Sequence, residues 1–378
     1  MFSFLEYIKW RGDLSFSMVS FTPVDAMVLC EFLYFTIDRY VPDDFEQEPV
    51  RIAEVCENDV LVPLPNYCTK EDLELQTLIK ESRRFGNVRV TGFRNIVDPS
   101  RNIQFCGATF LIDKRVSFVA FRGTDDSLIG WKENMDLAYN EVVPSQKEAV
   151  AYLEEAAKHV HGTIIVGGHS KGGNLAVYAS AVSTKKVNRR IEAVYNFDGP
   201  GFNEKVLSDE RFQEITDRVH TFVPQDSLIG LLLEHKEPIT VIHSRENNGV
   251  KQHHMVTWEV EPFDLVRDKG ITKAGENYRE NISEWIASMS EEQKRTFVNV
   301  LYDLVDDYKT TGELFTVKNL WKVMWEYKNM PDDNKKAITG AVGDLKDTVF
   351  ENVKDKIYEI RDKWLRSLGD EEGNRFLG

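Results

Sequence analysis

The sequence has only four cysteines, and they lie scattered along the chain without a C-x-x-C spacing: Cys30, Cys56, Cys68 and Cys106. This pattern argues against a disulfide framework or a zinc site and is typical of reduced thiols in the cytosol. The chain also lacks any run of about eighteen apolar residues, the length that a membrane-spanning helix needs. Its first residues lack the basic and long apolar segments of a secretion signal. We therefore expect a cytoplasmic protein without stable membrane insertion.

Positive charge is also scarce. Lys and Arg number 47 against 62 Asp and Glu, which gives a formal net charge of −15. Because such a chain repels phosphate groups, nucleic acid and anionic membrane surfaces are not expected as general partners. No H-E-x-x-H motif or comparable spacing of carboxylates occurs, so we expect neither a metal site nor a cofactor.

The 378 residues, of which 42% are hydrophobic, are sufficient to bury a large core. Residues 1–86 are predicted to be mostly helical, with one helix that is capped by Thr22 and begins at Pro23. From about residue 276 the composition changes to helix formers with few glycines. We therefore predict a main domain over 1–275 and a helical extension over 276–378.

The chain is organised around residues 163–180, TIIVGGHSKGGNLAVYAS. A β-branched apolar run is followed by a glycine pair, His169, Ser170, Lys171, a second glycine pair and a helical Ala/Leu pattern. This is the G-x-S-x-G motif of a nucleophile elbow between a strand and a helix. The glycines make room for a strained turn. The first free amides of the helix would favour negative charge beside the Ser170 hydroxyl.

Further strands and helices alternate around this stretch. Runs of β-branched and aromatic residues predict strands, and a capped amphipathic pattern predicts a helix over 146–160. The strands are expected at 88–93, 103–112, 116–121, 191–197, 219–223 and 239–243. Such alternation is typical of a mainly parallel sheet, in which functional groups gather at the carboxyl ends of strands. Candidate groups follow these strands at Ser170, Asp198, Asp226 and His253.

Two motifs carry a resemblance to a known family. Phe121-Arg122-Gly123-Thr124, followed by Trp131 and Asn134, resembles the oxyanion loop of class 3 (fungal-type) lipases. With the Gly-His-Ser-Lys-Gly-Gly elbow and the opening Trp10-Arg11-Gly12-Asp13, the chain is similar to an uncharacterised group of bacterial lipase-like α/β-hydrolases. The resemblance covers about residues 1–265. It implies an α/β-hydrolase with a mainly parallel central sheet, to which the helical C-terminal extension is added.

The resemblance also implies an oxyanion hole. In class 3 lipases the residue after Arg-Gly supplies a backbone amide, often with a hydroxyl, and that residue is Thr124 here. The partner amide is that of the residue after the nucleophile, which is Lys171. Two such donors usually contribute on the order of 3 kcal/mol each to acyl transfer. The segment 125–139 would correspond to a short lid helix, and the simpler interpretation is a surface helix whose Trp131 packs on the core.

A serine nucleophile needs a base and an orienting acid, and in α/β-hydrolases the chain order is Ser, acid, His. His253 and His254 lie in a loop after the last predicted strand, where the base is expected. The resemblance favours His253, because in the bacterial group a Gln-His pair precedes a strand with an aromatic residue. Asp226 resembles the lipase acid that follows a strand and precedes an apolar stretch. Asp198, one strand earlier in a Gly-Pro-Gly turn, is the alternative acid.

The residue after the serine departs from the lipase pattern, which has an apolar residue there. The Lys171 side chain could pair with Asp125 and Asp126, or it could favour acyl groups that carry a carboxylate or a phosphate. The sequence leaves both interpretations open.

We predict a serine hydrolase that cleaves small-molecule or lipid carboxylic esters through Ser170, His253 and Asp226, with an acyl-enzyme intermediate. A thioesterase or acyltransferase on the same site is the alternative among enzymes, and a non-catalytic binding module is the alternative outside them. In the extension, a long amphipathic helix after Pro331 either packs on the core or joins copies of the chain into a homo-oligomer.

Overall fold

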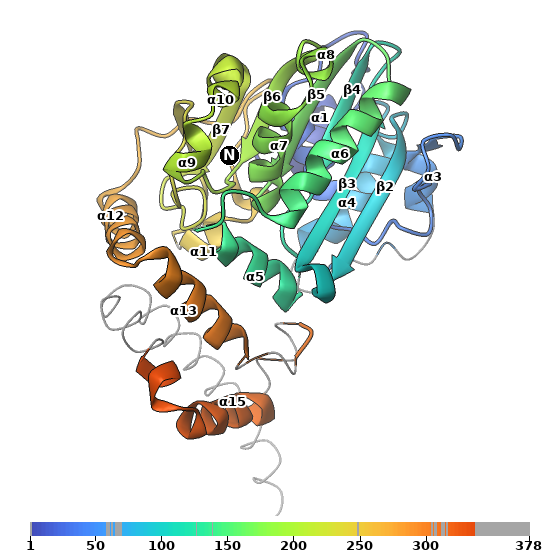
Figure 1. Ribbon diagram of the computed structural model, residues 1–378. Coiled ribbons are helices and arrows are strands. Elements are labelled where there is room, and N and C mark those ends of the chain that lie inside the picture. The colour runs from blue at the N-terminus through green and yellow to red at the C-terminus, as the bar shows by residue number, and fades with distance from the viewer. Residues whose placement is uncertain are drawn as a thin grey trace, which may run out of the picture.

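An eight-stranded mixed sheet forms the centre of the computed structural model (Figure 1). The structure describes residues 2–57, 61, 63–64, 70–125, 127–137, 139–247, 249–303, 305, 308–310, 314 and 317–336. The strands lie in the sheet in chain order: β1 (Val50–Arg51), β2 (Arg89–Asp98), β3 (Ile103–Leu111), β4 (Val116–Phe121), β5 (Thr163–His169), β6 (Ile191–Phe197), β7 (Val219–Pro224) and β8 (Ile239–Ile242). The predicted amphipathic helix after Pro331 falls mostly outside the described residues.

The two halves of the sheet differ in direction. Strands β1 to β4 pair antiparallel, whereas β4 to β8 pair parallel. The parallel half contains every strand that precedes a predicted site residue, and the antiparallel half extends the sheet on the other side of β4. With helices on both faces, this is the predicted α/β-hydrolase fold, and its sheet is less uniformly parallel than we expected.

The helices cover the two faces of the sheet in separate groups. They are α1 (Phe4–Arg11), α2 (Pro23–Phe32), α3 (Ile52–Glu57), α4 (Lys70–Glu81), α5 (Leu128–Asp136), α6 (Pro144–His159), α7 (Lys171–Val182), α8 (Lys185–Asn188), α9 (Glu204–Leu207), α10 (Glu210–Ile215), α11 (Gly249–Gln252), α12 (Lys273–Ser288), α13 (Glu291–Asp303) and α15 (Val317–Asn329). The parallel strands that are neighbours in the sheet are also consecutive in the chain. Because the connections between such strands almost always cross over with the same, right-handed sense, the helices in these connections lie on one face of the sheet. Figure 1 shows α6, α7 and α10 on that face and α1 and α4 behind the sheet.

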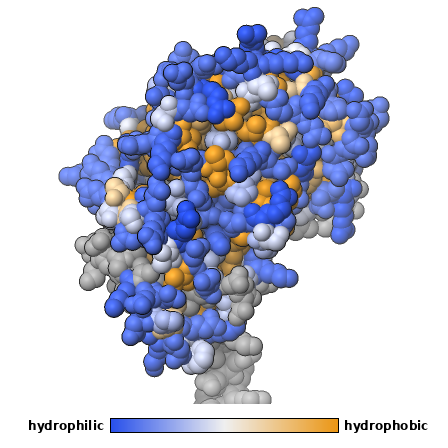
Figure 2. Space-filling model, in the orientation of Figure 1, coloured by the Kyte–Doolittle hydropathy of each residue, from blue (hydrophilic) through white to orange (hydrophobic). Residues whose placement is uncertain are grey.

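Two apolar cores follow from this arrangement. One lies between the sheet and α6, α7 and α10, and includes Leu153, Leu175 and Phe212. The other lies behind the sheet and includes Met27 of α2 together with Trp258 from the segment after β8. The outer surface on the side of α6 and α7 is mainly hydrophilic, with apolar residues in small groups (Figure 2). In the described part of the chain, no helix is both long and apolar enough to span a bilayer.

A buried ion pair ties the N-terminal helices together. Arg84 contacts both carboxylate oxygens of Asp25 at 2.6 Å, and both side chains are almost fully buried. The same guanidinium donates to the backbone carbonyls of Leu14, Val19 and Ser20. Since all its charge is paired or hydrogen-bonded, this arginine can sit in the interior and hold the segment between α1 and α2.

The C-terminal helices pack on α5. Leu128 of α5 joins an apolar cluster with Val305 and Tyr308, and the Leu128 amide donates to the Lys309 carbonyl at 3.0 Å. α12 begins at Lys273 and therefore runs across the boundary that we predicted between residues 275 and 276. The extension is thus connected to the main domain by a continuous helix and by contacts with α5.

Removing the acid of the buried pair should destabilise the fold. Asp25→Ala leaves the Arg84 guanidinium buried without its counter-charge, which typically costs about 3–5 kcal/mol. Glu74→Ala is the matched control, because the Lys9–Glu74 pair is about half exposed on both sides and such pairs contribute about 1 kcal/mol or less. Urea unfolding followed by circular dichroism measures both. Equal losses in the two variants would contradict a structural role for the buried pair.

Candidate active site

Ser170 occupies a strained turn between β5 and α7. Its backbone has φ 57° and ψ −132°, a region that non-glycine residues rarely adopt and that costs on the order of 1–3 kcal/mol. A Cβ at Gly168 would lie 2.2 Å from the Gly172 carbonyl oxygen, and one at Gly172 would lie 2.1 Å from the Phe121 carbonyl oxygen. The two glycines of the G-x-S-x-G motif are therefore needed because the backbones pass too closely for a side chain.

The start of α7 lies directly beside the serine. Ser170 is 6% exposed, and α7 begins at Lys171. Within the described residues the Lys171 amide makes no hydrogen bond, which is the usual state of a first-turn helix amide. Such an amide and the helix dipole favour an anion at this position.

The loop after β4 passes the serine on its other side. A Cβ at Gly123 would lie 2.8 Å from the Ser170 Cβ, so this loop is in close contact with the elbow. Thr124 follows; it is 4% exposed, and its hydroxyl accepts a hydrogen bond from Asn134 Nδ2 at 2.8 Å. α5, which carries Asn134, therefore sets the orientation of the Thr124 side chain.

The structure pairs His253 with Asp198 rather than with Asp226. His253 Nδ1 lies 2.6 Å from Asp198 Oδ2. The last residues of β5 and β6 are in register, so Ser170 and Asp198 follow adjacent strand ends at the same level. Asp226 follows β7, one strand further from the serine. Our prediction that Asp226 contacts the imidazole is therefore wrong, and the alternative, Asp198, occupies that position.

Asp198 is completely buried and well supplied with donors. Its Oδ1 accepts from the Ser227 hydroxyl at 2.5 Å and from the Gly230 amide at 3.1 Å. Burial raises the pKa of the Asp198 carboxyl, and the bonds from Ser227 and Gly230 oppose that shift. With His253 Nδ1–H as a third donor, the carboxylate form is hydrogen-bonded on both oxygens.

Asp226 instead holds the residue that precedes His253. Gln252 Nε2 donates to Asp226 Oδ2 at 3.1 Å, and Gln252 Oε1 accepts from the Asp226 amide at 2.9 Å. The hydroxyl of Thr272, which caps α12, donates to the other Asp226 oxygen. Trp258 Nε1 donates to the Gln252 carbonyl at 2.6 Å. Asp226 therefore fixes the backbone of the histidine loop and links it to the start of α12.

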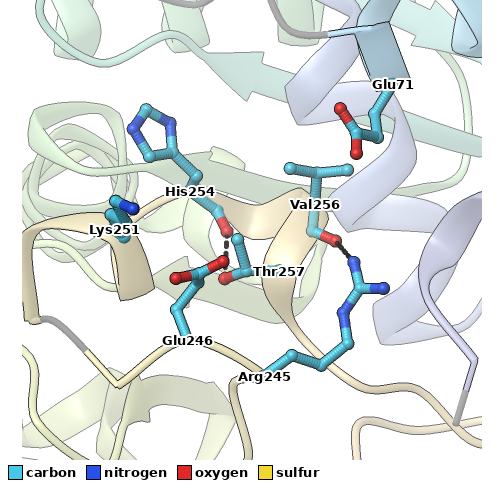
Figure 3. Close-up of a pocket in the computed structure, with 7 residues that line it drawn as sticks. All are labelled: Glu71, Arg245, Glu246, Lys251, His254, Val256 and Thr257. Atoms are coloured by element: carbon cyan, nitrogen blue, oxygen red, sulfur yellow. Dashed lines mark hydrogen bonds between the residues drawn. The ribbon is translucent and has the colours of Figure 1, made fainter.

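The two loop histidines face different surroundings. His253 is 15% exposed at its side chain, and burial lowers the pKa of its imidazole, with the neighbouring His254 adding to the shift. His254 lines a pocket of about 490 Å³ together with Glu71, Arg245, Glu246, Lys251, Val256 and Thr257. Figure 3 shows the His254 ring on one side of this pocket and Glu71 on the other. Ser170 and Asp198 do not line it, so this geometry favours His253 over His254 as the base.

A chain of hydrogen bonds joins the loops around the serine. His169 Nε2 lies 2.8 Å from the His253 carbonyl oxygen, which can only accept, so Nε2 carries the proton. Burial lowers the pKa of His169, so the ring is neutral and its Nδ1 accepts from the Tyr34 hydroxyl at 2.8 Å. The Tyr34 oxygen accepts in turn from the Gly123 amide at 3.2 Å. The His169 ring also packs on His253, with centroids 4.5 Å apart.

The Lys171 side chain has neither of the roles we considered. Its ammonium is fully buried, 2.9 Å from Glu133 Oε2 and 2.6 Å from the Gln104 carbonyl oxygen. Glu133 also accepts from the backbone amides of Gln104 and Ser145. Lys171 therefore pairs with Glu133 of α5 rather than with Asp125, and Asp126 lies outside the described residues. The pair fastens α5 to the sheet.

The segment that we compared with a lid helix is thus held on both sides. Glu133 fixes its inner side, and on its outer side Met135 packs against a cluster that contains Phe297 and Val298 of α13. Trp131 is 43% exposed and does not serve as the core anchor of the simpler interpretation. α5 is a short helix clamped between the sheet and the C-terminal helices.

Sequence reasoning missed several contributors to the site. Tyr34 lies 135 residues before its partner His169, and Gly230 and Ser227 contact Asp198 from a turn without a motif. Asp198, by contrast, was named as the alternative acid, because it directly follows a predicted strand and precedes a tight turn. The missed contacts join segments whose proximity is determined by the packing of the whole sheet.

Together these residues have the composition of a nucleophilic site. A strained serine lies beside an unbonded helix amide, and a buried imidazole is held by a carboxylate through Nδ1. This is the arrangement by which a base is oriented for proton transfer. Among the described residues, no group of three or more His, Cys, Asp and Glu could hold a metal ion.

Comparisons with known proteins show which family model the chain matches. A family model described as Mbeg1-like matches residues 79–303, more than half of the chain. No curated protein matches the chain. Among solved structures, a variant of MDLA from Penicillium cyclopium is 14% identical, with 64% of this chain and 82% of that one covered and a TM-score of 0.36. Rhizomucor miehei lipase with its propeptide is 13% identical, with 47% and 70% covered and a TM-score of 0.33.

The buried Lys171–Glu133 pair should be sensitive to loss of one partner. Lys171→Met leaves the Glu133 carboxylate buried without a counter-charge and should cost about 3–5 kcal/mol of unfolding free energy. Adding Glu133→Gln should recover a large part, because no charge then remains buried. Lys205→Met is the control, since the Lys205–Glu291 pair is more than half exposed on both sides. Chemical denaturation measures all three, and a double variant less stable than Lys171→Met would contradict the charge argument.

Proposed function

The chain belongs to the Mbeg1-like family, and we propose that it is a serine hydrolase that cleaves carboxylic esters of small molecules or lipids. The observation that carries the proposal is the 2.6 Å contact of His253 Nδ1 with Asp198. The strained Ser170 lies beside this pair, because its amide donates at 2.9 Å to the carbonyl of Phe197, the residue before Asp198. Strain of this kind persists only where the surrounding structure enforces it, and it gathers at active sites. In the triad, Asp198 takes the role that we had assigned to Asp226.

The proposed reaction has two acyl-transfer steps. Ser170 Oγ attacks the ester carbonyl while His253 Nε2 takes the hydroxyl proton, and Asp198 holds Nδ1–H and stabilises the imidazolium. Thr124 and the Lys171 amide bind the oxyanion of the tetrahedral intermediate. Its collapse releases the alcohol, which receives the proton from His253. A water molecule then attacks the acyl-enzyme with His253 as the base, which releases the acid and restores Ser170.

The buried state of Lys171 bears on the substrate. Because its ammonium is fully buried against Glu133, it offers no cation to a carboxylate or phosphate on the acyl group. This favours neutral acyl chains. A thioester, or an alcohol acceptor in place of water, would use the same residues, so thioesterase and acyltransferase activities remain alternatives on this site. A non-catalytic binding module would need neither the strained serine nor the oriented histidine.

A serine-directed probe tests the nucleophile. A fluorophosphonate should label the wild-type protein and leave Ser170→Ala unlabelled, because only an activated hydroxyl attacks the phosphorus. Ser288→Ala, at an exposed serine, should label like the wild type. Nitrophenyl esters of increasing acyl length give the chain-length preference in the same variants. A folded wild-type protein that resists labelling, with and without detergent, would exclude the hydrolase and support the binding module.

The two aspartates should differ strongly in their effect on turnover. Asp198→Asn removes the carboxylate that holds the correct His253 tautomer and should lower kcat by about 10³–10⁴-fold. Asp226→Asn weakens the hydrogen bond to the Gln252 side chain and should lower kcat much less. Ester hydrolysis at saturating substrate measures both. A larger loss in Asp226→Asn than in Asp198→Asn would contradict the assignment of the acid.

The pH profile should reflect the buried base. The reaction needs neutral His253, and burial lowers the pKa of this imidazole from the usual value of 6.5. Acidification therefore protonates the base only below that value, and kcat/KM should stay near its plateau down to about pH 6.5 before it falls. The profile is measured with an ester whose own hydrolysis is independent of pH in this range. A midpoint above 6.5 would contradict the prediction.

A further inference from the structure

A second histidine lies behind the proposed acid, in the segment between β7 and β8. The His235 and Glu237 side chains are each 4% exposed. A backbone bridge between Phe202 and Glu234 fixes the segment beside the turn that follows β6. The chain around His235 forms turns and bends rather than a helix or a strand. The proposed reaction does not use this histidine directly.

Both nitrogens of His235 face acceptors. Nε2 lies 2.9 Å from the Gly230 carbonyl oxygen, which cannot donate, so Nε2 carries a proton. Nδ1 lies 3.1 Å from Glu237 Oε1. That oxygen also accepts from the Thr221 hydroxyl, and hydrogen bonds from His235 and Thr221 outweigh burial and lower the pKa of Glu237. Both ring nitrogens therefore face an acceptor, an arrangement in which a doubly protonated ring would satisfy both hydrogen bonds.

Gly230 connects the His235 ring to Asp198. Its carbonyl accepts from His235 Nε2, and its amide donates to Asp198 Oδ1 at 3.1 Å. A Cβ at Gly230 would lie 2.2 Å from that oxygen, so the turn must approach the acid closely. Burial raises the pKa of Asp198, and the charge of His235 acts in the opposite direction, as the Ser227 and Gly230 bonds do.

The other charges near this segment point elsewhere. Glu234 pairs with Arg279 at the surface, where both side chains are about half exposed, and Lys236 is exposed. Glu237 is the buried carboxylate that contacts the His235 ring, and Asp198 is the buried carboxylate that Gly230 connects to it. A positive group between two carboxylates stabilises the ionised form of both.

We propose that His235 is a positioning residue for the acid of the triad: clamped between Glu237 and the Gly230 carbonyl, it orients the turn that binds Asp198 and supplies the positive charge that keeps Asp198 ionised opposite His253. The proposal rests on the proposed hydrolase function. It adds a residue that touches neither substrate nor reacting atoms and acts through Gly230 and through the electrostatic field at Asp198.

Replacing the charge while keeping a donor tests the proposal. His235→Gln can still donate to the Gly230 carbonyl but is neutral. Loss of the positive charge makes both Asp198 and His253 easier to protonate, so the acidic limb of kcat/KM should move up by about one pH unit. Activity should then fall about tenfold on that limb and change little on the plateau. His243→Gln is the control, since His243 pairs with Asp268 in a partly exposed position and its loss should leave the limb in place.

A merely structural role predicts a different result. If His235 only supported the fold, His235→Gln would lose activity equally at every pH and the limb would not move, which would overturn the proposal. Nitrogen NMR of histidine-labelled wild-type protein is independent of any variant's folding. It should show both His235 nitrogens protonated under the conditions of the activity assay, and a neutral ring would also overturn the proposal. Failure of the wild type to react with the fluorophosphonate would instead contradict the hydrolase function itself, while the NMR result would still report the His235 charge.

Discussion

The arrangement of the candidate site depends on the parallel pairing of three neighbouring strands, β4, β5 and β6. Their register brings the carboxyl ends of the strands to one level, so that the loop after β4, the turn after β5 and the turn after β6 lie side by side. Thr124, Ser170 and Asp198 are the residues that these three connections present. Because the backbone hydrogen bonds of the ladder determine this spacing, no side-chain contact is needed to bring the three together. The close approach of the backbones, in turn, excludes side chains at Gly123, Gly168 and Gly172.

Buried charge is placed around this edge in pairs. Lys171 and Glu133 are both fully buried, and they connect the residue after the serine to α5, whose Asn134 orients Thr124. His235 and Glu237 are a second buried, hydrogen-bonded pair, and Gly230 connects His235 to Asp198. Buried pairs of this kind add little net stability compared with apolar packing, but each strongly penalises any arrangement that separates its partners. In this molecule they lie next to the loop after β4 on one side of Ser170 and next to the turn that contacts Asp198 on the other.

The local features of the sequence anticipated the local structure well. The helix after Thr22 and the strand over 191–197 were predicted from residue patterns and are present. The carboxylate that contacts His253 was predicted wrongly for a specific reason. A chain-order rule allows any aspartate between Ser170 and the histidine, whereas the contact depends on which strand is the immediate neighbour of β5. Lys171 was misjudged similarly, because its partner Glu133 becomes its neighbour only when α5 packs on the sheet.

By itself, the sequence determined the elbow, the alternation of strands and helices, and the two loops that carry Ser170 and His253, since these depend on glycine placement and on the periodicity of apolar residues over short stretches. Only the tertiary structure decided which carboxylate meets His253, which residue neutralises Lys171, and that α5 is held between the sheet and the C-terminal helices. These are contacts between segments up to 67 residues apart for Lys171 and 55 for His253, and the order of strands in the sheet and the packing of helices on it determine them.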